Sequence, residues 1–128
     1  KCVTKKKVNK KIINDMIFAF AVCKHVKSNG IVIAKNQQVL GIGSGQMNRL
    51  DSIKIAYNKM KNNFNNPKNF IIASDAFFPF IDNINFFKKK NCKAIIQPGG
   101  SKKDKEIIDR ANNLGIAMYF TGIRHFKH

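Results

Sequence analysis

The chain has 128 residues, of which 44% are apolar, so we expect one globular domain with a buried core. This excludes a disordered or collagen-like chain, and the longest apolar run, residues 16–23, is too short to span a membrane. The net charge of +17 is typical of nucleic-acid binding, but 21 of the 24 basic residues are Lys. An A/T-rich codon bias would enrich Lys, Asn and Ile in the same way, so the charge is weak evidence for a nucleic-acid partner.

Helix and strand patterns alternate along the chain and predict an α/β layer fold, with strands in the middle and helices on both faces. Asn9 is expected to cap the first helix, whose apolar middle predicts a largely buried element. Asn48 and Asp51 are expected to form a reciprocal cap on the second helix, and Gly115 to end the fourth. The expected helices cover residues 9–26, 48–61, 82–91 and 101–114, and the expected strands cover residues 31–34, 38–42, 70–73, 94–97 and 116–121, with a hairpin turn at residues 36–37.

The three cysteines, Cys2, Cys23 and Cys92, are odd in number and far apart along the chain. Their spacing matches neither a disulfide framework nor a zinc-ligand pattern. It predicts a reducing, cytoplasmic environment without a structural zinc site. No signal peptide is expected, because no small-residue cleavage site follows the apolar stretch.

Sheets of this class place their sites in the loops that leave the carboxyl ends of strands. This rule selects four loops, at residues 28–30, 41–49, 74–82 and 97–102. In the first, Asn29 is either a turn residue or a donor to a developing oxyanion. The last leads into a helix, so Ser101 is either its cap or a ligand contact.

The loop at residues 41–46 follows the dinucleotide fingerprint only in part, because Gln46 replaces its third Gly. A flexible turn is as good an interpretation, although a glycine-rich loop before a helix can present backbone N–H groups to an anion. Arg49 lies in the first turn of that helix. It is either a solvated surface residue or the partner of a carboxylate.

Three Phe residues, Phe77, Phe78 and Phe80, follow a predicted strand within four positions. Rings held in a loop made rigid by proline can stack on a flat heterocycle, or they can form a small hydrophobic cluster. The sequence favours neither. The acidic residues that flank the rings, Asp75 and Asp82, are either turn or cap residues or take part in binding.

The segments KHVKSNGIV, GIGSGQMNRLDS, SDAFFPF, QPGGS and TGIRHFKH occur in this order. Together they closely resemble the family of bifunctional purine biosynthesis enzymes that joins AICAR formyltransferase to IMP cyclohydrolase. The resemblance implies that residues 1–128 are the C-terminal part of the formyltransferase domain, without the cyclohydrolase domain and the first copy of the transferase repeat. It also implies a three-layer αβα, cytidine-deaminase-like fold with a mixed sheet, although the deaminase zinc signature is missing.

The activity implied is formyl transfer from 10-formyltetrahydrofolate, as co-substrate, to the 5-amino group of AICAR. No metal, nucleic acid or membrane is implied, and the family's homodimer is the expected assembly. The family's proton-shuttling Lys–His pair lies in the first copy, so Lys24-His25 is not assigned that role. The resemblance implies that AICAR is bound by Asn29, Phe77 and Arg124, and that Asn29 is also the catalytic residue. It implies that folate is bound by Arg49, Asp82, Ser101 and Lys102.

Two alternatives remain open. A basic nucleic-acid-binding module would use the lysine runs at residues 5–7 and 88–90, with aromatic side chains on strands beside them. An inactive remnant would keep the fold without the partner segments.

Overall fold

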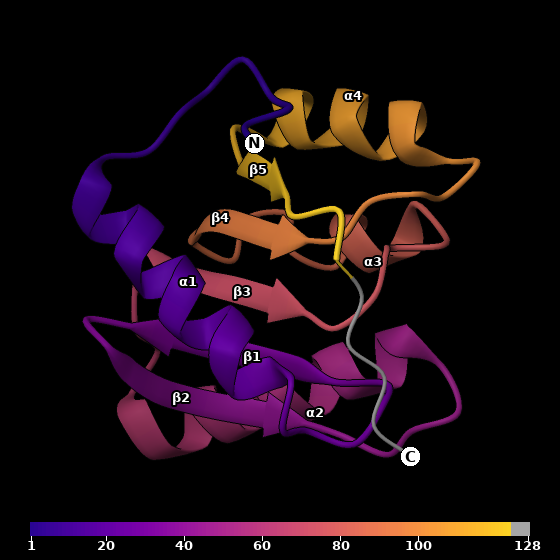
Figure 1. Ribbon diagram of the computed structural model, residues 1–128. Helices are drawn as coiled ribbons and strands as arrows, with labels where there is room; N and C mark the ends of the chain where they lie inside the picture. The colour runs from indigo at the N-terminus through magenta and orange to yellow at the C-terminus, as the bar shows by residue number, and fades with distance from the viewer. Residues whose placement is uncertain (124–128) are drawn as a thin grey trace.

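The computed structural model describes residues 1–123. A five-stranded mixed sheet lies at its centre, with strand order β2-β1-β3-β4-β5 (Figure 1). β1 runs antiparallel to both of its neighbours, whereas β3, β4 and β5 are mutually parallel. The strands are β1 (Ile31–Lys35), β2 (Gln38–Gly43), β3 (Phe70–Ser74), β4 (Cys92–Gln97) and β5 (Ala117–Phe120), and the helices are α1 (Lys10–Cys23), α2 (Arg49–Phe64), α3 (Asp82–Asn85) and α4 (Asp104–Leu114).

Helices cover both faces of this sheet, which confirms the predicted three-layer α/β fold. On one face, α1 packs its buried residues Met16, Ala19 and Cys23 against the sheet. On the other face, α2, α3 and α4 share a second core with β1, β3 and β4. β3 lies between these two cores and all five of its residues are buried, as its continuous apolar sequence predicts.

Local signals predicted the starts of α1 and α2 and the hairpin well. The side chains of Asn9 and Asn48 accept hydrogen bonds from the N–H groups of Ile12 and Asp51, so both are N-caps. The carboxylate of Asp51, however, accepts from the Asn48 side chain rather than from its backbone. Asn36 and Gln37 both have positive φ, as a two-residue hairpin turn requires.

The predicted extents of all four helices, and the predicted burial of α1, differ from the structure: α2, for example, runs to Phe64 instead of residue 61. α1 ends at Cys23 rather than Val26, and it is only half-buried: Ile17 is 57% exposed because a single face meets the sheet. α3 ends at Asn85 instead of residue 91, and turns occupy the remaining positions. α4 begins at Asp104, three residues after the predicted cap.

Two glycines in β2 allow α2 to pack unusually close to the sheet. A Cβ atom at Gly43 would collide with the backbone carbonyl of Ser52, and one at Gly41 would collide with that of Ala56. The glycine-rich segment is therefore largely a strand facing a helix, not an anion-binding loop. Gly45, with φ +67°, is the glycine that lies in the turn after the strand.

The direction of β1 decides where the loops gather. Because β1 is antiparallel to β2 and β3, its amino end lies at the same edge of the sheet as the carboxyl ends of the other four strands. Residues 28–30 enter β1 rather than leave a strand, so the rule that selected this loop was misapplied, although the loop reaches the same edge. Among residues 1–123, no helix is long and apolar enough to cross a membrane.

Candidate active site

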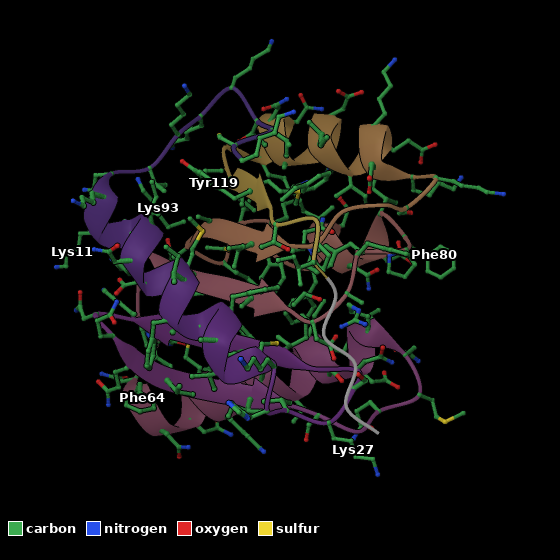
Figure 2. The ribbon with its side chains drawn as sticks, viewed as in Figure 1. Lys11, Lys27, Phe64, Phe80, Lys93 and Tyr119 are labelled. Carbon is green, nitrogen blue, oxygen red and sulfur yellow. The ribbon has the colours of Figure 1, made fainter. Side chains whose placement is uncertain are left out.

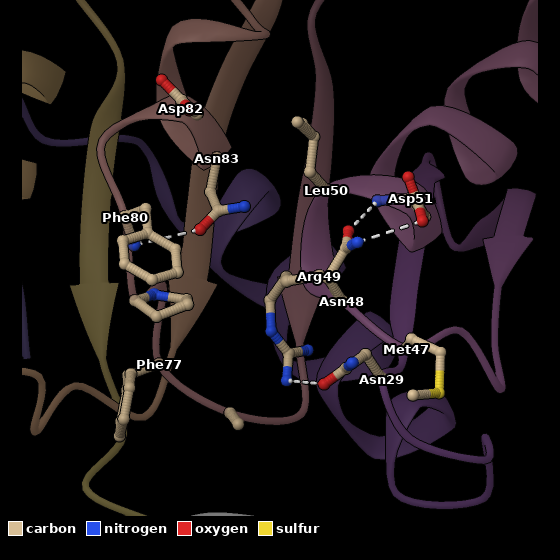
Figure 3. A pocket seen from close by; sticks show the side chains of 12 residues that line it. Asn29, Met47, Asn48, Arg49, Leu50, Asp51, Phe77, Phe80, Asp82 and Asn83 are labelled. Atoms are coloured by element: carbon tan, nitrogen blue, oxygen red, sulfur yellow. Dashed lines mark hydrogen bonds between the residues drawn. The ribbon is translucent and has the colours of Figure 1, made fainter.

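A pocket of about 580 Å³ opens at this edge of the sheet, between the start of α2 and the loop that follows β3 (Figure 3). Three of the four loops selected from the sequence contribute to it. The Phe77 and Phe80 side chains lie on one side, and Asn29 and Met47 lie on the other. Its lining consists of Asn29, Met47, Asn48, Arg49, Leu50, Asp51, Ala76, Phe77, Pro79, Phe80, Asp82 and Asn83.

Arg49, the first residue of α2, is buried beneath this pocket and forms an ion pair with Asp75. Its Nη1 lies 2.6 Å from Asp75 Oδ1, and the two side chains are only 5% and 0% exposed. The same nitrogen donates to Ser74 Oγ at 3.1 Å. The interpretation of Arg49 as a solvated surface residue was therefore wrong, because the charge is held inside the fold by a carboxylate.

The Asn29 carboxamide has an orientation determined by its partners. Its Oδ1 accepts a hydrogen bond of 2.7 Å from Arg49 Nη2, and its Nδ2 donates to the Gln46 carbonyl at 2.9 Å. The Asn29 backbone carbonyl accepts from Ser52 Oγ, so α2 holds both the side chain and the main chain. Nδ2 carries a second amide hydrogen, and Asn29 is one of the residues that line the pocket.

The three rings of the 74–82 loop separate instead of forming one platform. Phe78 is fully buried in the core shared by α2, α3 and α4. Phe77 is half-buried in the pocket wall, and Phe80 is 64% exposed and projects outward (Figure 2). Two rings therefore remain for a ligand, and the third anchors the loop that carries them.

The other predicted site residues differ in whether they line this pocket. Asp82, the first residue of α3, is exposed and lines the pocket. Ser101 and Lys102 line neither this pocket nor the smaller one beside it, which is formed among the described residues by Phe77, residues 98–100 and Gly122. Ser101 Oγ accepts from the Lys103 N–H, and the carboxylate of Asp104 accepts from the Ser101 N–H. Arg124 lies outside the described residues.

Sequence reasoning missed the importance of Asp75, which it left among possible turn or cap residues. The available signal was an acidic residue two positions after the apolar run at residues 70–73, where a charge needs a buried partner. Cys23 packs close to this pair. Burial raises the pKa of the Cys23 thiol, and the nearby Asp75 carboxylate raises it further. No group of three or more His, Cys, Asp or Glu side chains within residues 1–123 is arranged to hold a metal ion.

Comparison with known proteins finds relatives of this chain among bifunctional enzymes. A family model described as AICARFT/IMPCHase bienzyme matches residues 1–59. The bifunctional purine biosynthesis protein PurH of Aquifex aeolicus is 53% identical over 126 residues, which is 98% of this chain. The PurH of Persephonella marina is 50% identical over all 128 residues. The family model and these relatives confirm the resemblance to the AICARFT/IMPCHase bienzyme family. The chain spans about a quarter of the length of these relatives, 25% in both cases.

Solved structures confirm the deaminase-like fold that the family resemblance implies. Two crystal structures of the dCMP deaminase from cyanophage S-TIM5, one in apo form and one in complex with dCMP and dUMP, resemble this chain with TM-scores of 0.61 and 0.63. The alignments cover 89% and 90% of the chain at 15% and 14% identity. At that identity the likeness concerns the fold alone.

Proposed function

We propose that the chain forms part of an AICAR formyltransferase, which transfers the formyl group of 10-formyltetrahydrofolate to the 5-amino group of AICAR. Similarity to the bienzyme family supports the reaction class. The observation that carries the proposal is the Asn29 carboxamide, which lines a pocket opposite the Phe77 ring while internal hydrogen bonds fix its orientation.

The reaction is an acyl transfer through a tetrahedral intermediate. The AICAR amine forms a bond to the formyl carbon, and the carbonyl oxygen gains negative charge. The carbon–nitrogen bond to the folate then breaks, the folate nitrogen takes up a proton and the former amine loses one. The amine is a weak nucleophile, so positioning of the two substrates supplies much of the acceleration.

Asn29 is suited to the step in which the carbonyl oxygen of the formyl group gains negative charge. Arg49 and Gln46 use the Asn29 oxygen and one amide hydrogen, so the group offered to the pocket is a hydrogen-bond donor. We assign this donor to the formyl oxygen or the AICAR carboxamide, where it stabilises charge as it develops. Because α2 holds Asn29 in place, little reorganisation is needed during the reaction.

The remaining contacts divide between the two substrates. Phe77 stacks on the AICAR ring, and Arg124 binds its phosphate. The exposed Asp82 carboxylate orients the folate ring at the edge of the pocket, and Ser101 and Lys102 contact the folate from the neighbouring turn. Arg49 acts on folate only from the pocket floor, since its guanidinium is engaged by Asp75 and Asn29.

A chimeric enzyme tests this function. Residues 1–128 would replace the matching quarter of the Aquifex aeolicus relative, and formyl transfer would be measured with AICAR and 10-formyltetrahydrofolate. We expect turnover close to that of the parent relative and its loss in a chimera carrying Asn29→Ala. A folded chimera without turnover would refute the proposed function.

The same assay distinguishes a working enzyme segment from a remnant. The isolated chain should show no formyl transfer, because the resemblance places the proton-shuttling Lys–His pair in the other copy of the repeat. Loss of a proton-transfer group typically costs about 10²–10⁴-fold in rate. Turnover by the chain alone would show that the missing half is dispensable and would make Lys24-His25 the candidate pair for that role. A chimera that folds but remains inactive would support the remnant.

A further inference from the structure

We propose that Asp75 is a positioning residue for the reaction, acting on Asn29 through Arg49. This inference rests on the proposed function, since it assigns a partner to the residue placed at the reacting atoms. Asp75 is fully buried beneath the pocket and is absent from its lining. Its effect on the substrates must therefore pass through other side chains.

The two Asp75 oxygens bind different parts of the site. Oδ1 accepts from Arg49 Nη1 at 2.6 Å, and Arg49 in turn donates from Nη2 to Asn29 Oδ1 at 2.7 Å. Oδ2 accepts from Ser28 Oγ at 2.7 Å and from the Gly30 N–H at 3.0 Å. One carboxylate therefore holds the residues on both sides of Asn29 and the guanidinium that orients its amide.

This arrangement requires a carboxylate and not merely a polar group of the same shape. Both oxygens act only as acceptors, and every group around them is a donor. In Asp75→Asn, the new NH₂ group would face either Arg49 or the Gly30 N–H, so one pair of donors would repel. Either outcome displaces Asn29, because Arg49 holds its side chain, and Ser28 and Gly30 are its neighbours in the chain.

Asp15 provides a matched control within the same chain. It is also buried, at 1% exposed, and its carboxylate accepts from the backbone N–H groups of Asn36 and Gln37 and from the Gln37 side chain. These contacts hold the β1–β2 hairpin turn, at the opposite edge of the sheet from the pocket. Asp15→Asn makes the same chemical change without contact to Asn29.

The test uses the chimeric enzyme described above, with kinetics corrected for the folded fraction. We expect Asp75→Asn to lower kcat by about 10²-fold, as misplacement of a reacting group does, with little change in the KM for AICAR. Asp15→Asn should leave kcat unchanged. In an Asn29→Ala background, Asp75→Asn should cost little further turnover, because residues that act in one chain of contacts are not additive.

Several outcomes would overturn the inference. It fails if Asp75→Asn lowers kcat as strongly in the Asn29→Ala background as in the parent, or if Asp15→Asn lowers it equally. If Asp75→Asn does not fold, Arg49→Lys replaces it: lysine keeps the positive charge but cannot bridge Asp75 and Asn29 with two separate nitrogens. The same loss of kcat, and the same non-additivity with Asn29→Ala, are expected.

A crystal structure of each variant gives a readout that does not depend on turnover. The hydrogen bond from Arg49 to Asn29 should be lost or the Asn29 amide rotated in Asp75→Asn, and both should be intact in Asp15→Asn. An inactive parent chimera whose variants show this displacement would refute the formyltransferase function alone. An active parent with an unmoved Asn29 in Asp75→Asn would refute the positioning role alone.

Discussion

The side-chain oxygen of Gln97 accepts a hydrogen bond of 3.2 Å from the backbone N–H of Phe78. The same oxygen accepts from the Gly99 N–H at 3.3 Å, and Gln97 is fully buried. The last residue of β4 therefore joins the loop that carries Phe77 to the turn that leads to Ser101. The Gln97 side-chain amide therefore holds together the loop of Phe77, which we propose to contact AICAR, and the turn before Ser101, which we propose to contact folate.

Replacement of Gln97 should loosen both loops. Gln97→Leu leaves two buried N–H groups without an acceptor, and each unsatisfied group costs about 1–3 kcal/mol. We expect a lower free energy of unfolding in urea and, in the chimeric enzyme, a higher KM for AICAR. Gln38→Leu, at an exposed position, is the control. Equal stability and KM in Gln97→Leu and the parent would contradict this role.

Asn29 and Arg124 should differ in which kinetic constant they affect. Removal of one oxyanion donor typically costs about 10²–10³-fold in turnover, so Asn29→Ala should lower kcat far more than it weakens AICAR binding. Arg124→Ala should mainly raise the KM, because the phosphate is equally charged in the ground and transition states. Steady-state kinetics of both variants decide the matter. Normal turnover in Asn29→Ala would remove that residue from the mechanism.

The close packing of α2 on β2 should make Gly43 intolerant of any side chain. Overpacking of a core costs typically about 1–3 kcal/mol, and here the obstacle is the backbone carbonyl of Ser52, which cannot turn aside. Gly43→Ala should therefore lower the free energy of unfolding by at least about 2 kcal/mol. Gly45→Ala, where a Cβ atom would make only an ordinary contact with the Lys27 side chain and the positive φ opposes the substitution, should cost about 1 kcal/mol. Chemical denaturation of the two variants compares these costs.

The stability of the protein should fall in alkaline solution partly because of Cys23. Burial raises the pKa of this thiol in the folded state, so the unfolded chain loses the proton first as the pH rises above about 8.5. The free energy of unfolding should then decrease by up to about 1.4 kcal/mol per pH unit from this group. Urea titrations between pH 7 and 10 should show a shallower decline for Cys23→Ala. Val32→Ala, in the same core, should shift stability without changing the slope.

We expect the positive charge to confer no specific nucleic-acid binding. The labelled residues Lys11, Lys27 and Lys93 lie at separate places on the molecule, and both faces of the sheet are covered by helices (Figure 2). Binding to duplex and single-stranded oligonucleotides would be measured at about 150 mM salt, where charges are screened over roughly 8 Å. Submicromolar affinity with a base preference at that salt would show that the charge is functional.

Local chemistry made much of the fold predictable. Asn9, Asn48 and the turn at residues 36–37 each act on backbone groups within three positions, so their signals are contained in short segments. The continuous apolar sequence of β3 likewise predicted a strand buried on both faces. The shortness of α3 could not be predicted in this way, because the aromatic residues 86 and 87 fit either a helix or the packed turn that the structure shows.

Contacts across the chain decided what the sequence left open at the site. The burial of Arg49 depends on Asp75, which lies 26 residues away in sequence. Phe78 is the ring that enters the core, which it shares with residues of α2 and α4. Both helices are distant from Phe78 in the sequence. The loop at residues 28–30 reaches the pocket only because β1 runs against its neighbours, a direction that no single segment encodes.

The absence of side chains at Gly41 and Gly43 has a consequence beyond packing. These two positions set how near α2 lies to the sheet, and α2 begins with the residue that must reach the Asp75 carboxylate. A methyl group on this strand would lift the helix, and with it the guanidinium that orients the Asn29 amide. The lack of side chains at Gly41 and Gly43 thus determines how deep the pocket floor lies. A substitution at either glycine, although remote from any ligand, should alter the reaction as well as the stability.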